Sequence, residues 1–196
     1  MIRHCESDDD VLDCYGGASD FNLTERGIAT ATAFADTFAT FGIQKIFTSP
    51  YKRAHGVASI FAGYAGAQIG VIDNLREINT YGVMCGTNKD LAREIFGYWQ
   101  NKPEYKSYGY YKRKSFYGGE DVDEFDARVR DAFDTIAASG FDTVAIVTHG
   151  GVFRSVFQQI LKRAEHILEI EDCAVIEIEY TNGEFRFVKM DGIKTE

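Results

Sequence analysis

The sequence predicts an α/β fold, a three-layer α/β/α sandwich in which helices cover both faces of a mainly parallel sheet. Candidate strands alternate with amphipathic helices along the chain, and this alternation is typical of parallel sheets. Residues 143–148 form an almost unbroken apolar run, as expected of a parallel strand that is buried on both faces. The 196 residues suit a substantial core and show no repeat or linker. We therefore expect a single domain over residues 1–196.

In the first half of the chain, local signals place a strand before each of two helices. The first strand ends at Arg3. A helix follows over about residues 25–41, because Thr24 is a suitable N-cap and apolar residues recur at helical spacing until a glycine. Residues 43–47 are a short apolar strand candidate. The Ser-Pro pair that comes next predicts a second helix over about residues 49–61.

The second half continues the alternation and ends in a hairpin. Asp121 resembles an N-cap for an amphipathic helix over about residues 122–136. The buried apolar strand leads through two glycines into another helix over about residues 152–161. Residues 173–180 and 185–190 flank an Asn-Gly turn, which predicts a β-hairpin.

Composition argues against several classes of protein. The formal net charge of −9 disfavours nucleic-acid binding, which depends on Lys and Arg at the phosphates. The four cysteines form no CxxC pair, which argues against a zinc site and a disulfide framework. No apolar stretch approaches the roughly 18 residues of a membrane span, and no signal peptide is recognisable. We expect a cytoplasmic protein that binds no metal, nucleic acid or membrane; its oligomeric state stays open.

Two residues suggest an anion site on local grounds. His149 follows a buried strand and precedes two glycines and a helix start, where α/β sheets bind ligands and where an anion is favoured. The alternative is a strand-end histidine that satisfies a buried carbonyl. Arg53 lies in the first turn of a predicted helix, where the helix dipole disfavours a cation unless an anion is near. A solvated surface arginine is the alternative there.

Six short motifs occur in order between residues 3 and 154. They are RHCES at 3–7, GASD with LTERG at 17–27, TSPYKRA at 48–54, LRE at 75–77, GED with Phe125 and Arg128 at 119–128, and THGGVFR at 148–154. Together they resemble the signatures RHGE[ST], GxSDxxLTxxG, TSPLxRA, LxE, GES…F…R and SHGGxxR of the histidine phosphatase superfamily. The resemblance implies a phosphoglycerate-mutase-like fold.

The resemblance also implies a mechanism. His4 would attack phosphorus and carry a covalent phosphoryl group. Arg3, Arg53 and His149 would surround the transferred group, whose charge must be stabilised in phosphoryl transfer. Glu77 would protonate the leaving oxygen and then activate water. The implied activity is a metal-independent, cofactor-free phosphatase acting on a small phosphorylated substrate or a phosphoprotein.

Other positions near the motifs are candidate substrate contacts. Gly17 and Gly150 can let a ligand approach the backbone, and Asp10 stands where many members carry a phosphate-facing Asn. Cys5 replaces the usual Gly after the nucleophile. Beside Arg3 and near Arg53, the Cys5 thiol could have some thiolate character and hence redox sensitivity. A buried, inert thiol is the favoured interpretation.

A basic, tyrosine-rich segment suggests a lid or insertion at about residues 98–118. Its candidate substrate-binding cations are Lys112, Arg113 and Lys114. The alternative is a solvated surface loop. Two alternatives to a phosphatase also stay open, a phosphoglycerate-type mutase and a phosphate-binding regulatory module whose catalysis has lapsed.

Overall fold

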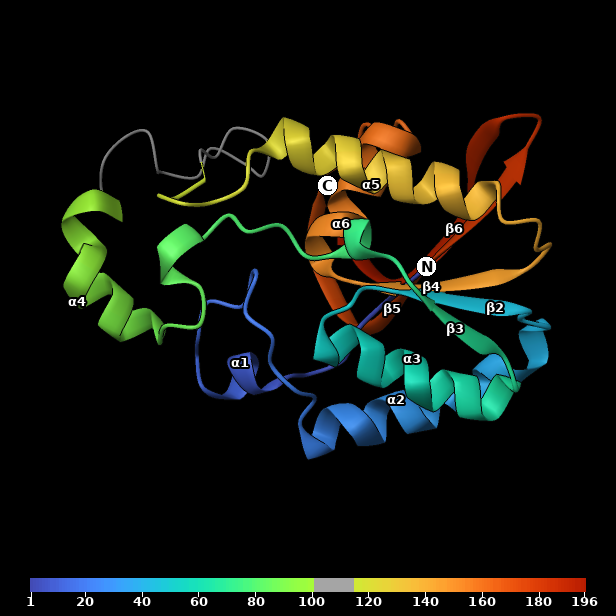
Figure 1. Ribbon diagram of the computed structural model, residues 1–196, viewed down its shortest axis with the longest axis horizontal. Helices are drawn as coiled ribbons and strands as arrows, with labels where there is room; N and C mark the ends of the chain where they lie inside the picture. The colour runs from blue at the N-terminus through green and yellow to red at the C-terminus, as the bar shows by residue number, and fades with distance from the viewer. Residues whose placement is uncertain (101–114) are drawn as a thin grey trace.

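A computed structural model describes residues 1–100 and 115–196, whose elements form three layers (Figure 1). The central layer is a six-stranded sheet in the order β3-β2-β4-β1-β5-β6. Its strands are β1 (Ile2–Arg3), β2 (Lys45–Thr48), β3 (Gln68–Val71), β4 (Val144–Thr148), β5 (Ile167–Thr181) and β6 (Glu184–Thr195). The first four are mutually parallel, and β5 and β6 are antiparallel additions. The predicted α/β sandwich with a mainly parallel sheet is confirmed.

Helices cover both faces of the sheet (Figure 1). They are α1 (Asp8–Val11), α2 (Glu25–Phe38), α3 (Lys52–Ala65), α4 (Lys89–Gln100), α5 (Val122–Ala137) and α6 (Gly150–Ser155). The pair α2 and α3 lies on one face and α5 and α6 on the other, whereas α4 lies away from the sheet. Among the described residues, no helix combines the length and apolar character that crossing a bilayer requires.

Side chains on the central strands alternate between two cores. Ile46 and Val147 pack against α2 and α3, whereas Phe47 and Ile146 pack against α5 and the region after α6. This alternation follows from the two-residue period of a strand. The apolar run before His149 predicts a central strand because a strand that is buried on both faces has apolar residues at successive positions.

The predicted helix caps and hairpin turn are present. The Thr24 hydroxyl accepts the N–H of Gly27 at 3.0 Å, and α2 begins directly after it. Asp121 accepts N–H groups from the second and third residues of α5. Asn182 and Gly183 both have positive φ, 55° and 83°, as a tight hairpin turn requires.

Several predicted boundaries were wrong. The second helix starts at Lys52 rather than at the Ser49-Pro50 pair, because Tyr51 is still extended. The Ser49 hydroxyl accepts the N–H of Tyr51 at 3.3 Å and also lies 2.8 Å from His149 Nε2. The helix also continues to Ala65. The helix after the two glycines begins at Gly150, and its last part, Val156–Ile160, is π-helical.

Three elements were missed, and the hairpin is longer than predicted. The missed elements are α1, β3 and α4. Strand β3 has only four residues, all at least partly exposed, so it has no strong apolar pattern. Both hairpin strands extend beyond the predicted ranges, and β5 contains an irregularity between Ile170 and Val175.

Candidate active site

Two histidines meet at the carboxyl ends of adjacent parallel strands. Arg3 pairs with Thr148 in the β1–β4 register, so His4 and His149 each follow the last paired residue of their strand. The His4 N–H donates to the Thr148 carbonyl at 2.9 Å. The two rings lie edge to face with centroids 5.0 Å apart, and both are buried. This is the edge of the sheet at which α/β proteins bind ligands.

The hydrogen bonds of His4 define which ring nitrogen is free. Its Nδ1 lies 2.8 Å from the Cys5 carbonyl, which can only accept, so Nδ1 carries the proton. The Nε2 atom then has a lone pair, which accepts from Arg53 Nε at 3.3 Å. Burial lowers the pKa of His4 well below its usual value, and the charges of Arg53 and Arg3 lower it further. These contacts and charges favour a neutral His4 imidazole whose Nε2 is unprotonated.

Arg53 is not the solvated surface residue of the alternative interpretation. It is 2% exposed, near the start of α3. Besides the bond to His4, it donates to the carbonyls of Ser19 at 2.6 Å and Gly17 at 3.0 Å. Gly17 has φ 49°, and a Cβ there would come within 2.8 Å of the Cys85 sulfur. The glycine thus permits the backbone conformation that holds the buried arginine.

His149 has one satisfied and one unsatisfied ring nitrogen. Its Nε2 lies 2.8 Å from the Ser49 hydroxyl, whereas its buried Nδ1 has no hydrogen-bond partner among the described residues. The alternative of a histidine that satisfies a buried carbonyl does not match this arrangement. Burial, followed by the charge of Arg53 and the neighbouring His4, lowers the pKa of His149 well below its usual value. The buried Nδ1 of His149 is thus a polar atom to which a bound ligand could form a hydrogen bond.

Arg3 is held from the antiparallel side of the sheet. Its Nη1 donates to the Ile170 carbonyl at 2.6 Å and lies 3.5 Å from the Asp172 carboxylate. Asp172 also accepts the Glu6 N–H at 3.0 Å, so one side chain of β5 contacts both ends of the loop that contains His4. Sequence analysis missed Asp172, which is adjacent to the predicted hairpin but carries no recognisable motif.

Glu77 is brought to the start of α6, beside His149. Both of its carboxylate oxygens lie 3.0 Å from the N–H of Gly151, and one accepts the N–H of Ile78 at 2.8 Å. Gly150 lies against the same carboxylate, since a Cβ on this glycine would be 4.0 Å from Glu77 Oε2. The segment predicted to carry the proton donor therefore lies next to the second histidine.

Tyr51 is a further residue of the site that sequence analysis missed. Its ring lies edge to face with His149, with centroids 5.5 Å apart, and the Arg53 guanidinium lies 5.1 Å from the ring centroid. It occupies the place of the leucine in TSPLxRA, and this departure was the available signal.

The remaining candidate contacts are placed differently. Asp10 is exposed, and its carboxylate accepts the Ser7 N–H at 3.0 Å in the cap of α1. Lys112, Arg113 and Lys114, and with them most of the predicted lid at 98–118, lie outside the described residues. Within the described part of the chain, no group of three or more His, Cys, Asp or Glu residues could hold a metal ion.

Cys5 does not have the environment of a thiolate. It is fully buried, and the pKa of its thiol is raised, first by a hydrogen bond with Cys173 and then by burial. This environment agrees with the favoured interpretation of a buried, inert thiol and speaks against thiolate character.

We therefore predict that Cys5→Ala loses activity in peroxide at the same rate as the parent protein, because a buried protonated thiol reacts slowly. The measurement is the rate of inactivation at fixed peroxide, with the partly exposed Cys14→Ala as the control. Slower inactivation of Cys5→Ala alone, with recovery of the parent by a thiol reductant, would show that Cys5 is reactive.

Comparisons with known proteins agree with this arrangement. A model of the histidine phosphatase superfamily (branch 1) matches residues 1–192. The chain is 30% identical over 179 residues to a 2,3-bisphosphoglycerate-dependent phosphoglycerate mutase of Rhizobium meliloti, covering 87% of this chain and 82% of the relative. It is 24% identical over 165 residues to phosphoserine phosphatase 1 of Hydrogenobacter thermophilus, covering 82% and 74%. The fold is similar to that of a phosphoglycerate mutase from Bacillus anthracis, with a TM-score of 0.81, 20% identity and coverage of 95% and 89%.

Proposed function

Because this chain belongs to the histidine phosphatase superfamily (branch 1), we propose that it hydrolyses phosphate monoesters through a phosphohistidine on His4. The observation that carries the proposal is the hydrogen bonding of His4. Its Nδ1–H donates to the Cys5 carbonyl, and its Nε2 accepts a hydrogen bond from Arg53. An unprotonated imidazole nitrogen beside a buried cation is suited to attack an anionic phosphorus centre once the cation moves its hydrogen bond to the phosphoryl group. The substrate is a small phosphorylated compound or a phosphoprotein.

In the first step, His4 Nε2 forms a bond to phosphorus as the ester P–O bond breaks. Arg53 exchanges its bond to Nε2 for one to a phosphoryl oxygen, and Arg3 and the unpaired Nδ1 of His149 contact the others. Glu77, protonated at this stage, gives its proton to the departing oxygen, so the alcohol leaves neutral. Side-chain cations stabilise the transferred charge, and no metal is invoked.

In the second step, the Glu77 carboxylate takes a proton from water as the water oxygen attacks phosphorus. The P–N bond breaks, inorganic phosphate leaves, and His4 returns to its neutral form with the proton still on Nδ1. Glu77 ends protonated, as it began.

A phosphoglycerate-type mutase is the second candidate, because a relative with that name is 30% identical to the chain, compared with 24% for a phosphoserine phosphatase. A mutase must keep water from the phosphohistidine and hold a substrate carboxylate, which calls for extra cations on a closing cover. The basic segment at 98–118 shows no motif that matches the mutases, so we favour the phosphatase. The presence of all five implied site residues speaks against a lapsed binding module; they are Arg3, His4, Arg53, Glu77 and His149.

A product assay separates these functions. Purified protein is given a panel of phosphate esters, and 3-phosphoglycerate with and without a 2,3-bisphosphoglycerate primer. We expect free phosphate as the main product, with no dependence on the primer. Formation of 2-phosphoglycerate faster than phosphate release from any ester would establish the mutase instead, and no turnover of any substrate would favour the binding module.

A further inference from the structure

Arg128 on α5 uses every one of its donors within the protein. A guanidinium has five N–H groups. Nε and Nη2 donate to the two Glu120 oxygens at 2.6 and 2.8 Å, Nη1 donates to the carbonyls of Asn74 and Arg76 at 2.8 and 2.9 Å, and Nη2 also reaches the Glu77 carbonyl at 3.3 Å. No donor of this side chain is left for a substrate.

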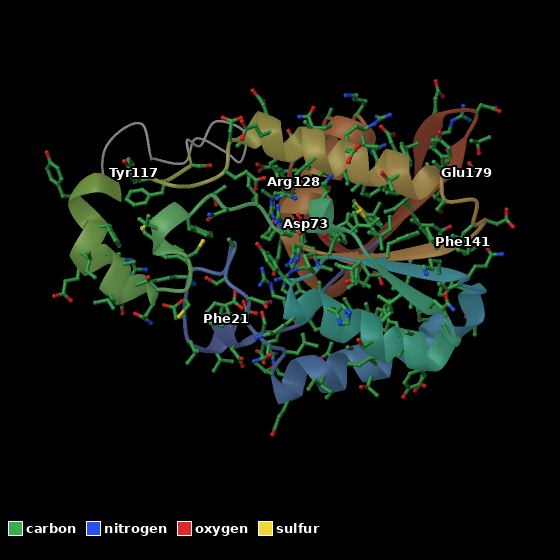
Figure 2. All side chains as sticks on the ribbon, in the orientation of Figure 1. Phe21, Asp73, Tyr117, Arg128, Phe141 and Glu179 are labelled. Carbon is green, nitrogen blue, oxygen red and sulfur yellow. The ribbon has the colours of Figure 1, made fainter. Side chains whose placement is uncertain are left out.

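The acceptors of Arg128 lie on one side of the proposed active site. The guanidinium extends from α5 toward the segment that carries Asp73 and leads to Glu77 (Figure 2). After the short 3-10 turn Asp73–Leu75, this segment has neither helix nor strand, so its carbonyls depend on side chains for partners. The Thr148 hydroxyl supplies another such bond, to the Leu75 carbonyl at 2.8 Å.

The Arg128–Glu120 pair is itself well shielded. The two side chains are 13% and 21% exposed, and Arg128 lies over the Phe125 ring at 4.6 Å from its centroid. Glu120 is also tied to the segment after Glu77, because its N–H donates to the Asn79 carbonyl at 2.8 Å. The pair therefore contacts the chain on both sides of Glu77.

We propose that Arg128, oriented by Glu120, is a positioning residue that fixes the backbone of Glu77 so that its carboxylate meets the leaving oxygen. The inference rests on the proposed function, in which Glu77 is the proton donor. A displacement of about 1 Å of a catalytic group can cost about 10²-fold in rate. Arg128 thus acts through Glu77 and touches neither substrate nor phosphoryl group.

The first test is the dependence of the Arg128→Met defect on the leaving group. Alkyl phosphates need protonation of the departing oxygen, whereas aryl phosphates with acidic phenols need little. We expect kcat for an alkyl phosphate to fall by about 10- to 100-fold, with a loss of less than about 3-fold for an aryl phosphate. Arg128→Lys should not restore the alkyl rate, because a single ammonium cannot replace the planar fork. An equal loss on both substrates overturns the proposal.

Arg130→Met is the matched control. Arg130 lies on the same helix, two residues away, and pairs with Asp134 on the exposed surface. This variant removes an arginine from α5 without touching the Glu77 segment and should retain both rates. An alkyl-selective defect in Arg130→Met would show that any loss of a cation from α5 suffices, which contradicts the proposal.

A double-mutant cycle separates this inference from the proposed function. If Arg128 acts through Glu77, adding Arg128→Met to Glu77→Gln should change the alkyl rate by less than about 2-fold. Suppose instead that Glu77→Gln slows only the alkyl ester and that Arg128→Met slows the double variant by as much as it slows the parent protein. This result overturns the positioning role of Arg128 and leaves the proton-donor role of Glu77 intact. A Glu77→Gln defect that is equal on alkyl and aryl esters overturns the proton-donor role and the positioning role together. Should Arg128→Met fail to fold, Glu120→Gln, which keeps the size of the side chain but weakens the pair, takes its place under the same criteria.

Discussion

His4→Ala should lose phosphatase activity by about 10⁴-fold or more, because the variant lacks the nucleophile of the proposed phosphoenzyme. His149 also contacts His4, but its Nε2 is engaged by Ser49, and in the proposed mechanism its Nδ1 donates to a phosphoryl oxygen and has no lone pair for attack. The measurement is kcat for an aryl phosphate, which needs little help from a proton donor. His55→Ala is the matched control, since His55 lies on α3 and its imidazole bonds to the exposed Ser59 hydroxyl.

The same experiment has a chemical readout. Quenching the parent protein during turnover of a labelled ester should give an adduct that is labile in acid and stable in alkali, on the peptide that contains His4. Label on a serine or cysteine, or turnover of His4→Ala close to that of the parent, would contradict the phosphohistidine mechanism.

Local sequence signals were sufficient where the pattern of the element is short-range. The apolar run before His149 and the capped, amphipathic helix after Asp121 are such patterns, and both elements formed where predicted. The start of α3 was misplaced because a Ser-Pro pair is a strong helix signal in isolation. The Ser49 hydroxyl accepts the Tyr51 N–H, but it is also engaged by His149, which is 100 residues away in the sequence, and Tyr51 stays extended.

Candidate site residues could be predicted where they belong to a motif. Contacts between residues that are distant in the sequence could not be predicted. His4 and Glu77 came from motifs, and the structure brings their segments to the same end of the sheet as His149. The burial of Arg53 and the contact between Arg3 and Asp172 have no local signal, since the latter spans 169 residues of sequence. The five hydrogen bonds of Arg128 could not be predicted either, because three of them go to backbone carbonyls, whose positions depend on the fold and not on residue type.

Cys5 shows that a neighbour in the sequence does not by itself define the environment of a side chain. Its position beside His4 and near Arg3 left open a cationic environment with a lowered thiol pKa, although a buried, inert thiol was the favoured interpretation. In the folded chain, the Cys5 side chain lies in the core, and its thiol forms a hydrogen bond with the free thiol of Cys173. This hydrogen bond and the burial raise the pKa of the Cys5 thiol by more than the charge of Arg3 lowers it. A charged neighbour in the sequence therefore shifts the pKa of a side chain strongly only when the two side chains point to the same place in the fold.

Arg53→Met should reduce kcat/KM by about 10²- to 10³-fold, because a buried cation that stabilises developing charge is among the largest contributions to phosphoryl transfer. Arg53→Lys keeps the charge but loses the fork that bonds His4 and the carbonyls of Ser19 and Gly17 at once. We therefore expect a loss of about 10-fold or more for lysine as well. Lys52→Met is the matched control, since the neighbouring Lys52 is exposed and pairs with Asp20.

The two Arg53 variants should differ in their effect on the protonation of His4. Burial is the largest cause of the lowered His4 pKa, and the charge of Arg53 is the next. Removing that charge in Arg53→Met should raise the pKa of His4, so that the inactive imidazolium persists to higher pH, whereas Arg53→Lys should leave the pKa nearly unchanged. The measurement is an NMR titration of the imidazole signals, which is feasible because the chain has only four histidines and His4→Ala identifies the signal. A His4 pKa that stays the same in Arg53→Met would mean that burial alone keeps the nucleophile neutral, and that Arg53 serves only the phosphoryl group.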